Sequence, residues 1–204
     1  MTSYNQTKRI LQYRMGILRL KKMGLERVFS YTLGKETGVS AELVRKDFSQ
    51  FGIKGNRRGG YDIDELLAAM EHIFGKERVQ NVIIIGMGSV GSALSKYKGF
   101  SERKVNIVAG FDIDPSKRSK KYSIPVYSPD HLADVIEAFN VSVAILAVPE
   151  IAAQETANLL VEKGIKGILN FAPVLLKVPD DVLVNNVNLL VELERLMYHS
   201  GVLK

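Results

Sequence analysis

Apolar residues recur at helical spacing through the first third of the chain. Four helices are predicted, over residues 7–22, 30–37, 41–51 and 63–74. Gly38 marks a turn before the third helix, and Ser40 is a favourable N-cap for it. Two short extended segments then flank a glycine-rich basic tip, which is typical of a hairpin wing. This order of elements predicts a winged helix-turn-helix domain over residues 1–78.

The hydrophobic pattern changes after residue 78. Residues 82–85 are four consecutive β-branched residues, as a strand buried on both faces requires. Further strands are predicted at 105–111, 126–127, 143–148 and 168–169, and helices over 89–97, 129–139 and 151–163. Strands that alternate with helices predict an α/β fold of the Rossmann type, with a doubly wound parallel sheet, over residues 79–186.

The last segment, residues 187–204, has apolar side chains on more than half of a predicted helix surface. They are Leu189, Leu190, Val191, Leu193, Leu196 and Met197. A helix of this kind needs burial on more than one side. The core of its own domain is one place for it, but the helix follows a completed sheet. We therefore expect it to insert into a partner subunit and form a homodimer.

The positive charge of the chain is concentrated in its first third. The net charge is +6, but residues 1–60 carry thirteen Lys/Arg against four Asp/Glu, residues 61–80 carry a net charge of −3, and the remainder is neutral. A basic region beside a neutral domain suggests a polyanion partner, and in a helix-turn-helix this is double-stranded DNA. A solvated basic face without a partner is the alternative.

The third predicted helix and the wing supply the candidate DNA contacts. Val44, Phe48 and Phe51 should face the core, so the opposite side of the helix is exposed. The candidate DNA-binding residues are Arg45, Lys46, Ser49, Lys54, Arg57 and Arg58. The helix residues can reach major-groove edges or phosphates, and the wing residues can reach phosphates or a minor groove.

The composition excludes several classes of chemistry. The chain has no cysteine, so it has no disulfide, thiolate zinc site, iron–sulfur ligand or cysteine nucleophile. Its start is polar, and no apolar stretch approaches the roughly 20 residues of a membrane helix, so we expect a cytoplasmic protein. None of the three histidines is assigned a catalytic role. No room remains for a substrate domain, so we expect a sensor and no enzyme.

A glycine motif follows the first strand of the second domain. Residues 86–91 read Gly86, Met87, Gly88, Ser89, Val90 and Gly91, which is G-x-G-x-x-G between a predicted strand and a predicted helix. This context predicts a dinucleotide pyrophosphate at the helix N-terminus. Asp112 ends the next long strand, where its carboxylate would accept hydrogen bonds from the adenosine ribose. Because it would repel a 2′-phosphate, NAD(H) is favoured over NADP(H), although Lys117 and Arg118 weaken that preference slightly.

Several further segments together resemble the Rex family of bacterial redox-sensing transcriptional repressors. They are VRKDFS at 44–49, GGYD at 59–62, GMGSVGSAL at 86–94, YKGF at 97–100, FDIDP at 111–115, VP at 148–149 and GIKGILNFAP at 164–173. The resemblance implies a homodimer with a swapped C-terminal helix that binds a palindromic operator. It also implies that NADH releases the DNA, whereas NAD⁺ binds more weakly and permits DNA binding. With the glycine loop and Asp112, the matched segments add Tyr97, Ile113, Val148, Pro149 and Asn170 to the candidate nucleotide-binding residues.

The chain departs from the Rex pattern at two positions. The resemblance implies an aspartate at the start of the swapped helix and an arginine in the first helix, which help to couple nucleotide to domain position together with the tyrosine that Tyr97 matches. Asn188 and Met15 stand at these positions, with Arg14 beside Met15. We expect a rewired or weaker NADH response, in which a hydrogen bond from Asn188 to Tyr97 or Arg14 could substitute for the charged contact.

Two other classes of protein remain open. A small NAD-dependent oxidoreductase would consume NADH with some substrate, but it would need a substrate domain. A nucleotide- or CoA-binding module shares the Rossmann plan. Asp112 argues against CoA, whose ribose carries a 3′-phosphate that a carboxylate would disfavour.

Overall fold

The computed structural model describes residues 4–56, 58–74, 79–118 and 122–201. The chain divides into two compact units, Met1–Arg78 and Val79–Lys204. Each unit has its own hydrophobic core. Among the described residues, no helix is long and apolar enough to cross a membrane.

The first unit is a winged helix-turn-helix. Its elements are α1 (Tyr4–Lys22), β1 (Arg27–Val28), α2 (Ser30–Thr37), α3 (Ala41–Gln50), β2 (Tyr61–Asp62) and α4 (Ile63–Ile73). Gly38 ends α2 in the left-handed region at φ 73°, and the Ser40 hydroxyl accepts from the Leu43 N–H to cap α3. Val44 and Phe48 are fully buried and Phe51 packs against the same core, so the predicted apolar stripe is confirmed.

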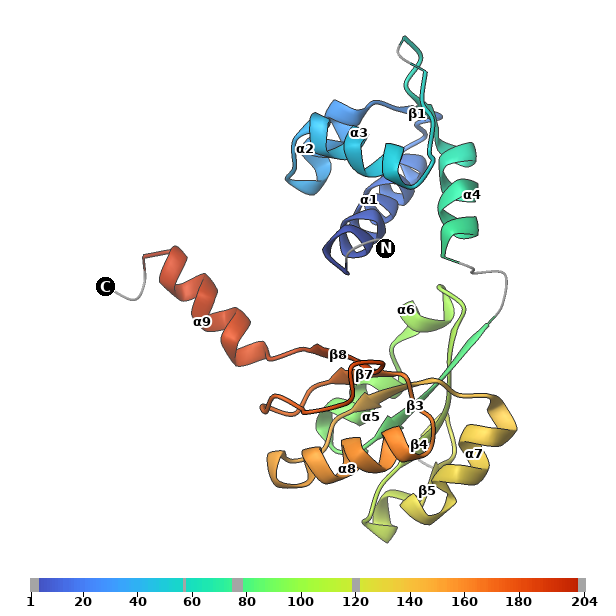
Figure 1. Ribbon diagram of the computed structural model, residues 1–204, viewed down its shortest axis with the longest axis vertical. Helices are drawn as coiled ribbons and strands as arrows, with labels where there is room; N and C mark the ends of the chain where they lie inside the picture. The colour runs from blue at the N-terminus through green and yellow to red at the C-terminus, as the bar shows by residue number, and fades with distance from the viewer. Residues whose placement is uncertain (1–3, 57, 75–78, 119–121, 202–204) are drawn as a thin grey trace. The chain divides into compact units, whose positions relative to one another are not determined.

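The wing differs in pairing from a simple hairpin. Its second arm, β2, pairs antiparallel with β1, which the sequence pattern does not predict. Among the residues of the wing that the structure describes, the two arms pair at one bridge, between Asn56 and Gly60. The Asn56 side chain accepts from the Arg58 and Gly59 N–H groups and so closes the tip. Figure 1 shows this narrow loop projecting beyond the helices of its own unit.

The second unit confirms the Rossmann-type sheet. Its strands are β3 (Gln80–Ile85), β4 (Val105–Phe111), β5 (Val126–Tyr127), β6 (Val143–Leu146), β7 (Gly167–Asn170) and β8 (Leu183–Asn186). All neighbouring strands are parallel, in the order β5-β4-β3-β6-β7-β8. The chain runs from β3 to β4 and β5 on one side and then crosses to β6, β7 and β8 on the other, so the switch point of the sheet lies between β3 and β6.

Helices cover both faces of this sheet. They are α5 (Ser89–Ser95), α6 (Lys98–Ser101), α7 (Leu132–Phe139), which follows a 3-10 turn (Pro129–His131), and α8 (Glu150–Glu162). Alternate residues of β3 enter two separate core clusters, Ile83 and Ile85 on one face and Val82 and Ile84 on the other. This double burial explains the continuous apolar run in the sequence.

The final helix, α9 (Leu189–His199), has no buried residue. Asn188 begins it, and its side-chain oxygen accepts from the Leu190 and Val191 N–H groups at 3.1 and 3.2 Å. Leu189, Leu193 and Leu196 are all more than half exposed. Figure 1 shows α9 standing apart from the α/β layers of its own unit. Burial in the core of its own domain, the first alternative for this helix, is therefore not what the structure shows.

Candidate nucleotide-binding cleft and nucleic-acid interface

A cleft of about 600 Å³ opens at the carboxyl ends of β3, β4 and β6. This is the switch point at which doubly wound sheets bind their ligands. Five predicted nucleotide-binding residues line it, namely Gly86, Asp112, Ile113, Val148 and Pro149. The far wall comes from α8 and includes Glu155, Thr156 and Leu159, which the sequence analysis missed because nothing in a helix sequence shows which face borders a cleft.

The three glycines of the loop have three different environments. Gly86 has φ 92°, and a Cβ there would lie 2.4 Å from the Ala147 carbonyl oxygen. At Gly91 a Cβ would lie 1.9 Å from the Gly86 carbonyl oxygen, so this glycine permits the close approach of α5 to the loop. At Gly88 a Cβ would meet nothing within 4 Å. Open space at the N-cap of α5 is what a pyrophosphate needs.

The Asp112 carboxylate connects the end of β4 to the glycine loop. One oxygen accepts from the Met87 N–H at 2.8 Å, and the other accepts from the Asp114 N–H at 2.9 Å. A carboxylate oxygen has two acceptor sites, so both oxygens retain capacity for ribose hydroxyl groups. The loop, the open space at Gly88 and this oriented acceptor fit an adenine dinucleotide.

Asp112→Ala should weaken NADH binding by about 1.5–3 kcal/mol for each ribose hydrogen bond lost, because each involves a charged acceptor. Asp112→Asn keeps an oxygen that can accept from the Met87 N–H but removes the charge. The Asp112→Asn variant should therefore bind NADH more weakly, and the ratio of its NADH affinity to its NADPH affinity should be smaller than in the parent. Calorimetry with both nucleotides measures this, and unchanged NADH affinity in both variants would contradict the assignment.

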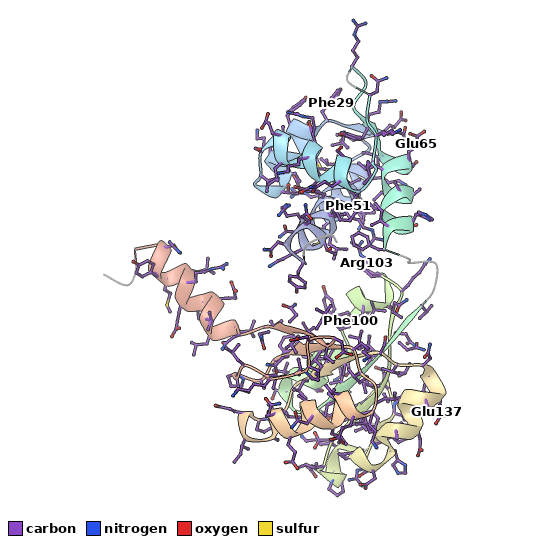
Figure 2. All side chains as sticks on the ribbon, viewed as in Figure 1. Phe29, Phe51, Glu65, Phe100, Arg103 and Glu137 are labelled. Atoms are coloured by element: carbon purple, nitrogen blue, oxygen red, sulfur yellow. The ribbon has the colours of Figure 1, made fainter. Side chains whose placement is uncertain are left out.

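The remaining predicted nucleotide-binding residues lie outside the cleft lining. Met87 is fully buried, and Ser89 and Val90 lie in the exposed first turn of α5. Tyr97 is 61% exposed and packs edge-on against Phe100 of α6, which Figure 2 labels. A role of these four residues in nucleotide binding stays a prediction.

Asn170 has a clear structural role. Its side chain is fully buried at the end of β7. The amide nitrogen donates to the Val174 carbonyl and to the Asn186 side chain, both at 2.8 Å, and the oxygen accepts from the Ala172 N–H at 2.9 Å. These bonds join the loop after β7 to β8. A direct contact of Asn170 with nucleotide stays a prediction.

The exposed face of α3 carries the predicted DNA-binding residues. Arg45, Lys46 and Ser49 are all exposed, and so are Lys54 and Arg58 on the wing. Arg57, the sixth predicted contact, lies outside the described residues. Arg27 donates to the Gly59 carbonyl at 2.6 Å and so attaches the wing to β1.

Arg45 is connected to both helices of the helix-turn-helix. One terminal nitrogen donates to the Ser30 hydroxyl at 2.9 Å, and the other donates to the Glu42 carboxylate at 3.0 Å. A groove beside it is lined by Phe29, Gly55 and Tyr61 among others. Figure 2 labels Phe29 near the base of the wing. Ser30, Glu42 and Phe29 were missed by the sequence analysis.

A buried carboxylate fixes the other side of α3. Asp47 is fully buried and accepts two hydrogen bonds from Arg9 at 2.7 Å and one from the Tyr13 hydroxyl at 2.8 Å. Burial acts to raise the pKa of Asp47, but the bonds from Arg9 and Tyr13 outweigh it and the pKa is lowered. Burial, together with the bond to Asp47, raises the pKa of Tyr13 to about 12. The helix α3 is thus anchored to α1 by an ion pair.

The two departures from the Rex pattern differ in exposure, because Met15 is exposed and Asn188 is half-buried. Met15 is 65% exposed on α1, and the Asn188 oxygen caps α9. Arg14, in contrast, is buried in its own unit and faces Glu71 of α4 at 3.5 Å. The structure therefore gives no support to Arg14 as a substitute partner for Asn188. Among the described residues, no cluster of side chains is suited to hold a metal ion.

These two units define a class of protein, a helix-turn-helix regulator joined to a dinucleotide-type sensor domain. Comparisons with known proteins agree with each part. Residues 5–49 match the family model "Putative DNA-binding protein N-terminus", and residues 77–174 match the model "CoA binding domain". A redox-sensing transcriptional repressor Rex from Carboxydothermus hydrogenoformans is 41% identical over 192 residues, which cover 94% of this chain and 92% of that protein.

Solved structures give the same result. RSP, a Rex-family repressor, has been solved with β-NADH and with β-NAD⁺ and operator DNA. Both complexes are 34% identical to this chain and cover 98% of it, with TM-scores of 0.88 and 0.91; the matches cover 95% and 93% of the RSP chains. The chain belongs to the Rex family of redox-sensing transcriptional repressors, so the expected family and fold are confirmed.

Proposed function

We propose that this chain binds operator DNA through α3 and the wing, binds NAD(H) in the cleft of its second unit, and loses DNA affinity when NADH binds. The observation that carries the proposal is the Asp112 carboxylate held against the glycine loop, beside open space at Gly88, in a chain that also presents a basic α3. RSP, solved with β-NADH and with β-NAD⁺ and operator DNA, supports both ligands. Acting on operator DNA, the protein would work in the cytoplasm.

The functional unit in this proposal is a homodimer. The exposed apolar side chains of α9 need a partner surface, because a contiguous apolar patch on a soluble protein marks an interaction site. A two-fold dimer of helix-turn-helix units binds two half-sites, which makes the operator palindromic. Removal of residues 187–204 should therefore abolish the dimer, which light scattering measures.

The direct test is operator binding by the full chain in separate titrations with NAD⁺ and NADH. We expect NADH to lower DNA affinity and NAD⁺ to have a smaller effect. By reciprocal linkage, DNA must weaken NADH binding by the same factor. If the two nucleotides act equally, the redox-sensing proposal fails.

CoA is the second candidate ligand, because residues 77–174 match a CoA-binding domain model. The acceptor-only carboxylate of Asp112 disfavours it, since it would face the ribose 3′-phosphate. Titration with CoA and with NADPH, alongside NADH, separates these ligands. We expect NADH to bind most tightly of the three.

Arg45 and Arg58 should affect DNA binding in different ways. Arg45→Ala should relax sequence preference, because a bidentate contact with guanine is worth about 1–3 kcal/mol of discrimination. Arg58→Ala should weaken binding to all sequences and reduce the salt slope by roughly 0.9 for a lost phosphate contact. Affinities for specific and scrambled duplexes across a salt series measure both effects. If a chain that lacks residues 1–78 still binds operator DNA, the assignment of α3 and the wing as the DNA interface is wrong.

The coupling between the two sites should be weaker than in a relative with both charged residues. Asn188 is neutral, and Met15 cannot donate a hydrogen bond. Combining Asn188→Asp with Met15→Arg should increase the NADH-driven loss of DNA affinity by about 1 kcal/mol, within the usual 1–3 kcal/mol of allosteric coupling. Operator affinity with and without saturating NADH gives the coupling, and no gain in the double variant would contradict this prediction.

A further inference from the structure

The Arg45 guanidinium is tethered by two hydrogen bonds to side chains of its own unit. Its terminal nitrogens donate in two directions, to the Ser30 hydroxyl at the start of α2 and to the Glu42 carboxylate in the first turn of α3. Each terminal nitrogen of an arginine carries two N–H groups, so each keeps a second donor for a base edge. A planar group held at both ends presents its remaining donors in one direction.

This arrangement has an electrostatic consequence as well. Glu42 is exposed, and like any glutamate of ordinary pKa it is ionised at neutral pH. Hydrogen bonds from its own backbone N–H, from Ser40 and from Arg45 lower its pKa further. A carboxylate on a DNA-facing helix repels phosphate and offsets part of the charge of Arg45. It therefore reduces the attraction to DNA of any sequence, which depends on neutralising phosphates.

We propose that Glu42 is a positioning residue for sequence recognition, which orients Arg45 toward a guanine and lowers affinity for non-specific DNA. The inference rests on the proposed function, because it takes the exposed face of α3 as the DNA-binding face. Glu42 acts through Arg45 and needs no base contact of its own. Specificity is the difference between the affinities for specific and non-specific DNA. The Glu42 carboxylate increases this difference in two ways, because it orients Arg45 for the specific sequence and repels the phosphates of DNA of any sequence.

The test uses the full chain and DNA that the parent itself selects from a random duplex library. Three kinds of probe are compared: one selected duplex, copies of it in which each G·C pair is replaced by A·T in turn, and a scrambled duplex. Glu42→Gln should raise affinity for the scrambled duplex about threefold. It should also reduce discrimination at one G·C pair of each half-site about tenfold. Unchanged discrimination at every G·C pair overturns the proposal.

Matched variants separate orientation from charge. Glu42→Asp keeps the charge on a shorter side chain, so it should lose discrimination while affinity for the scrambled duplex stays low. Ser30→Ala removes the other hydrogen bond without a change in charge and should have the same pattern. Glu36→Gln removes an equal charge from an ion pair with Arg19 and should leave discrimination unchanged. If Glu36→Gln lowers discrimination as much as Glu42→Gln does, the effect is general charge and the proposal fails.

A double-variant cycle distinguishes positioning from direct reading. With Arg45→Ala already present, Glu42→Gln should cause no further loss of discrimination, because the group that Glu42 positions is gone. A full additional loss would mean that Glu42 reads a base itself and would overturn the positioning role. Failure of the parent to select any DNA sequence would instead contradict the proposed function. Thermal melting of each variant confirms that the winged-helix unit remains folded.

Discussion

Asp47→Ala should destabilise the winged-helix unit by about 3 kcal/mol and abolish DNA binding at moderate temperature. Removal of one partner from a buried ion pair typically costs about 3–5 kcal/mol, because the other charge remains without compensation. The lower figure applies here because the Arg9 side chain is 24% exposed and can be hydrated. The Tyr13 hydroxyl also loses its acceptor inside the core. Urea unfolding of the full chain, followed by tyrosine signals, measures the loss.

The acid dependence of this stabilisation has a definite sign. The folded pKa of Asp47 is lowered, so its contribution is present above its unfolded pKa of about 3.9 and is lost as pH falls through the folded value. The parent should therefore lose stability below about pH 4 through this group. Asp47→Asn, which keeps an acceptor for Tyr13 but no charge, should lack that part of the acid dependence.

Tyr13 sets the alkaline limit of the same cluster. Its pKa is raised from 10.0 to about 12, so its contribution to stability is present below pH 10.0 and is lost between pH 10.0 and about 12.

The exposed pair of Arg19 and Glu36 is a suitable control for Asp47→Ala, because surface ion pairs contribute about 0–1 kcal/mol. If Glu36→Gln costs as much stability as Asp47→Ala, the buried cluster is not the anchor of α3.

The helical periodicity of the sequence indicates that Asp47 is buried. It lies three residues after Val44 and four before Phe51, inside the apolar stripe of α3. A carboxylate within such a stripe must be buried with partners or must distort the packing. The partners themselves could not be predicted, because Arg9 and Tyr13 are more than thirty residues away in the chain.

The sequence analysis missed two strands, β1 and β8, for different physical reasons. β1 is only Arg27–Val28, too short to show any alternation, and its existence depends on pairing with β2. β8 is an edge strand with mostly exposed side chains, so it lacks the continuous apolar run that revealed β3. The local sequence pattern was sufficient to predict a strand that is buried on both faces, because burial dictates apolar residues. It was insufficient for strands that form only because they pair with a neighbouring strand.

The same distinction applies to the two candidate sites. The glycine loop and Asp112 were predictable because their chemistry is tied to a fixed order of strand, turn and helix. The tethering of Arg45 by Ser30 was not, because it depends on how α2 packs against α3.

Gly88→Val should reduce NADH affinity at least a hundredfold, roughly 2.8 kcal/mol, while the fold stays intact. The backbone of Gly88 has φ −69°, which any residue can adopt, and an added Cβ meets no protein atom within 4 Å. The valine side chain would instead fill the space at the N-terminus of α5 in which the pyrophosphate is proposed to lie. Calorimetry with NADH, paired with a thermal melt without nucleotide, measures affinity and stability separately.

Gly91→Ala provides the contrast that makes this prediction specific. A Cβ at Gly91 would lie 1.9 Å from the Gly86 carbonyl oxygen, so α5 must shift away from the loop. This variant should therefore lower the melting temperature of the second unit, whereas Gly88→Val should not. Because Gly88→Val leaves α3 and the wing unchanged, it should still bind operator DNA, and NADH should no longer release it. Normal release of DNA by NADH from Gly88→Val would show that the nucleotide does not bind at the N-terminus of α5.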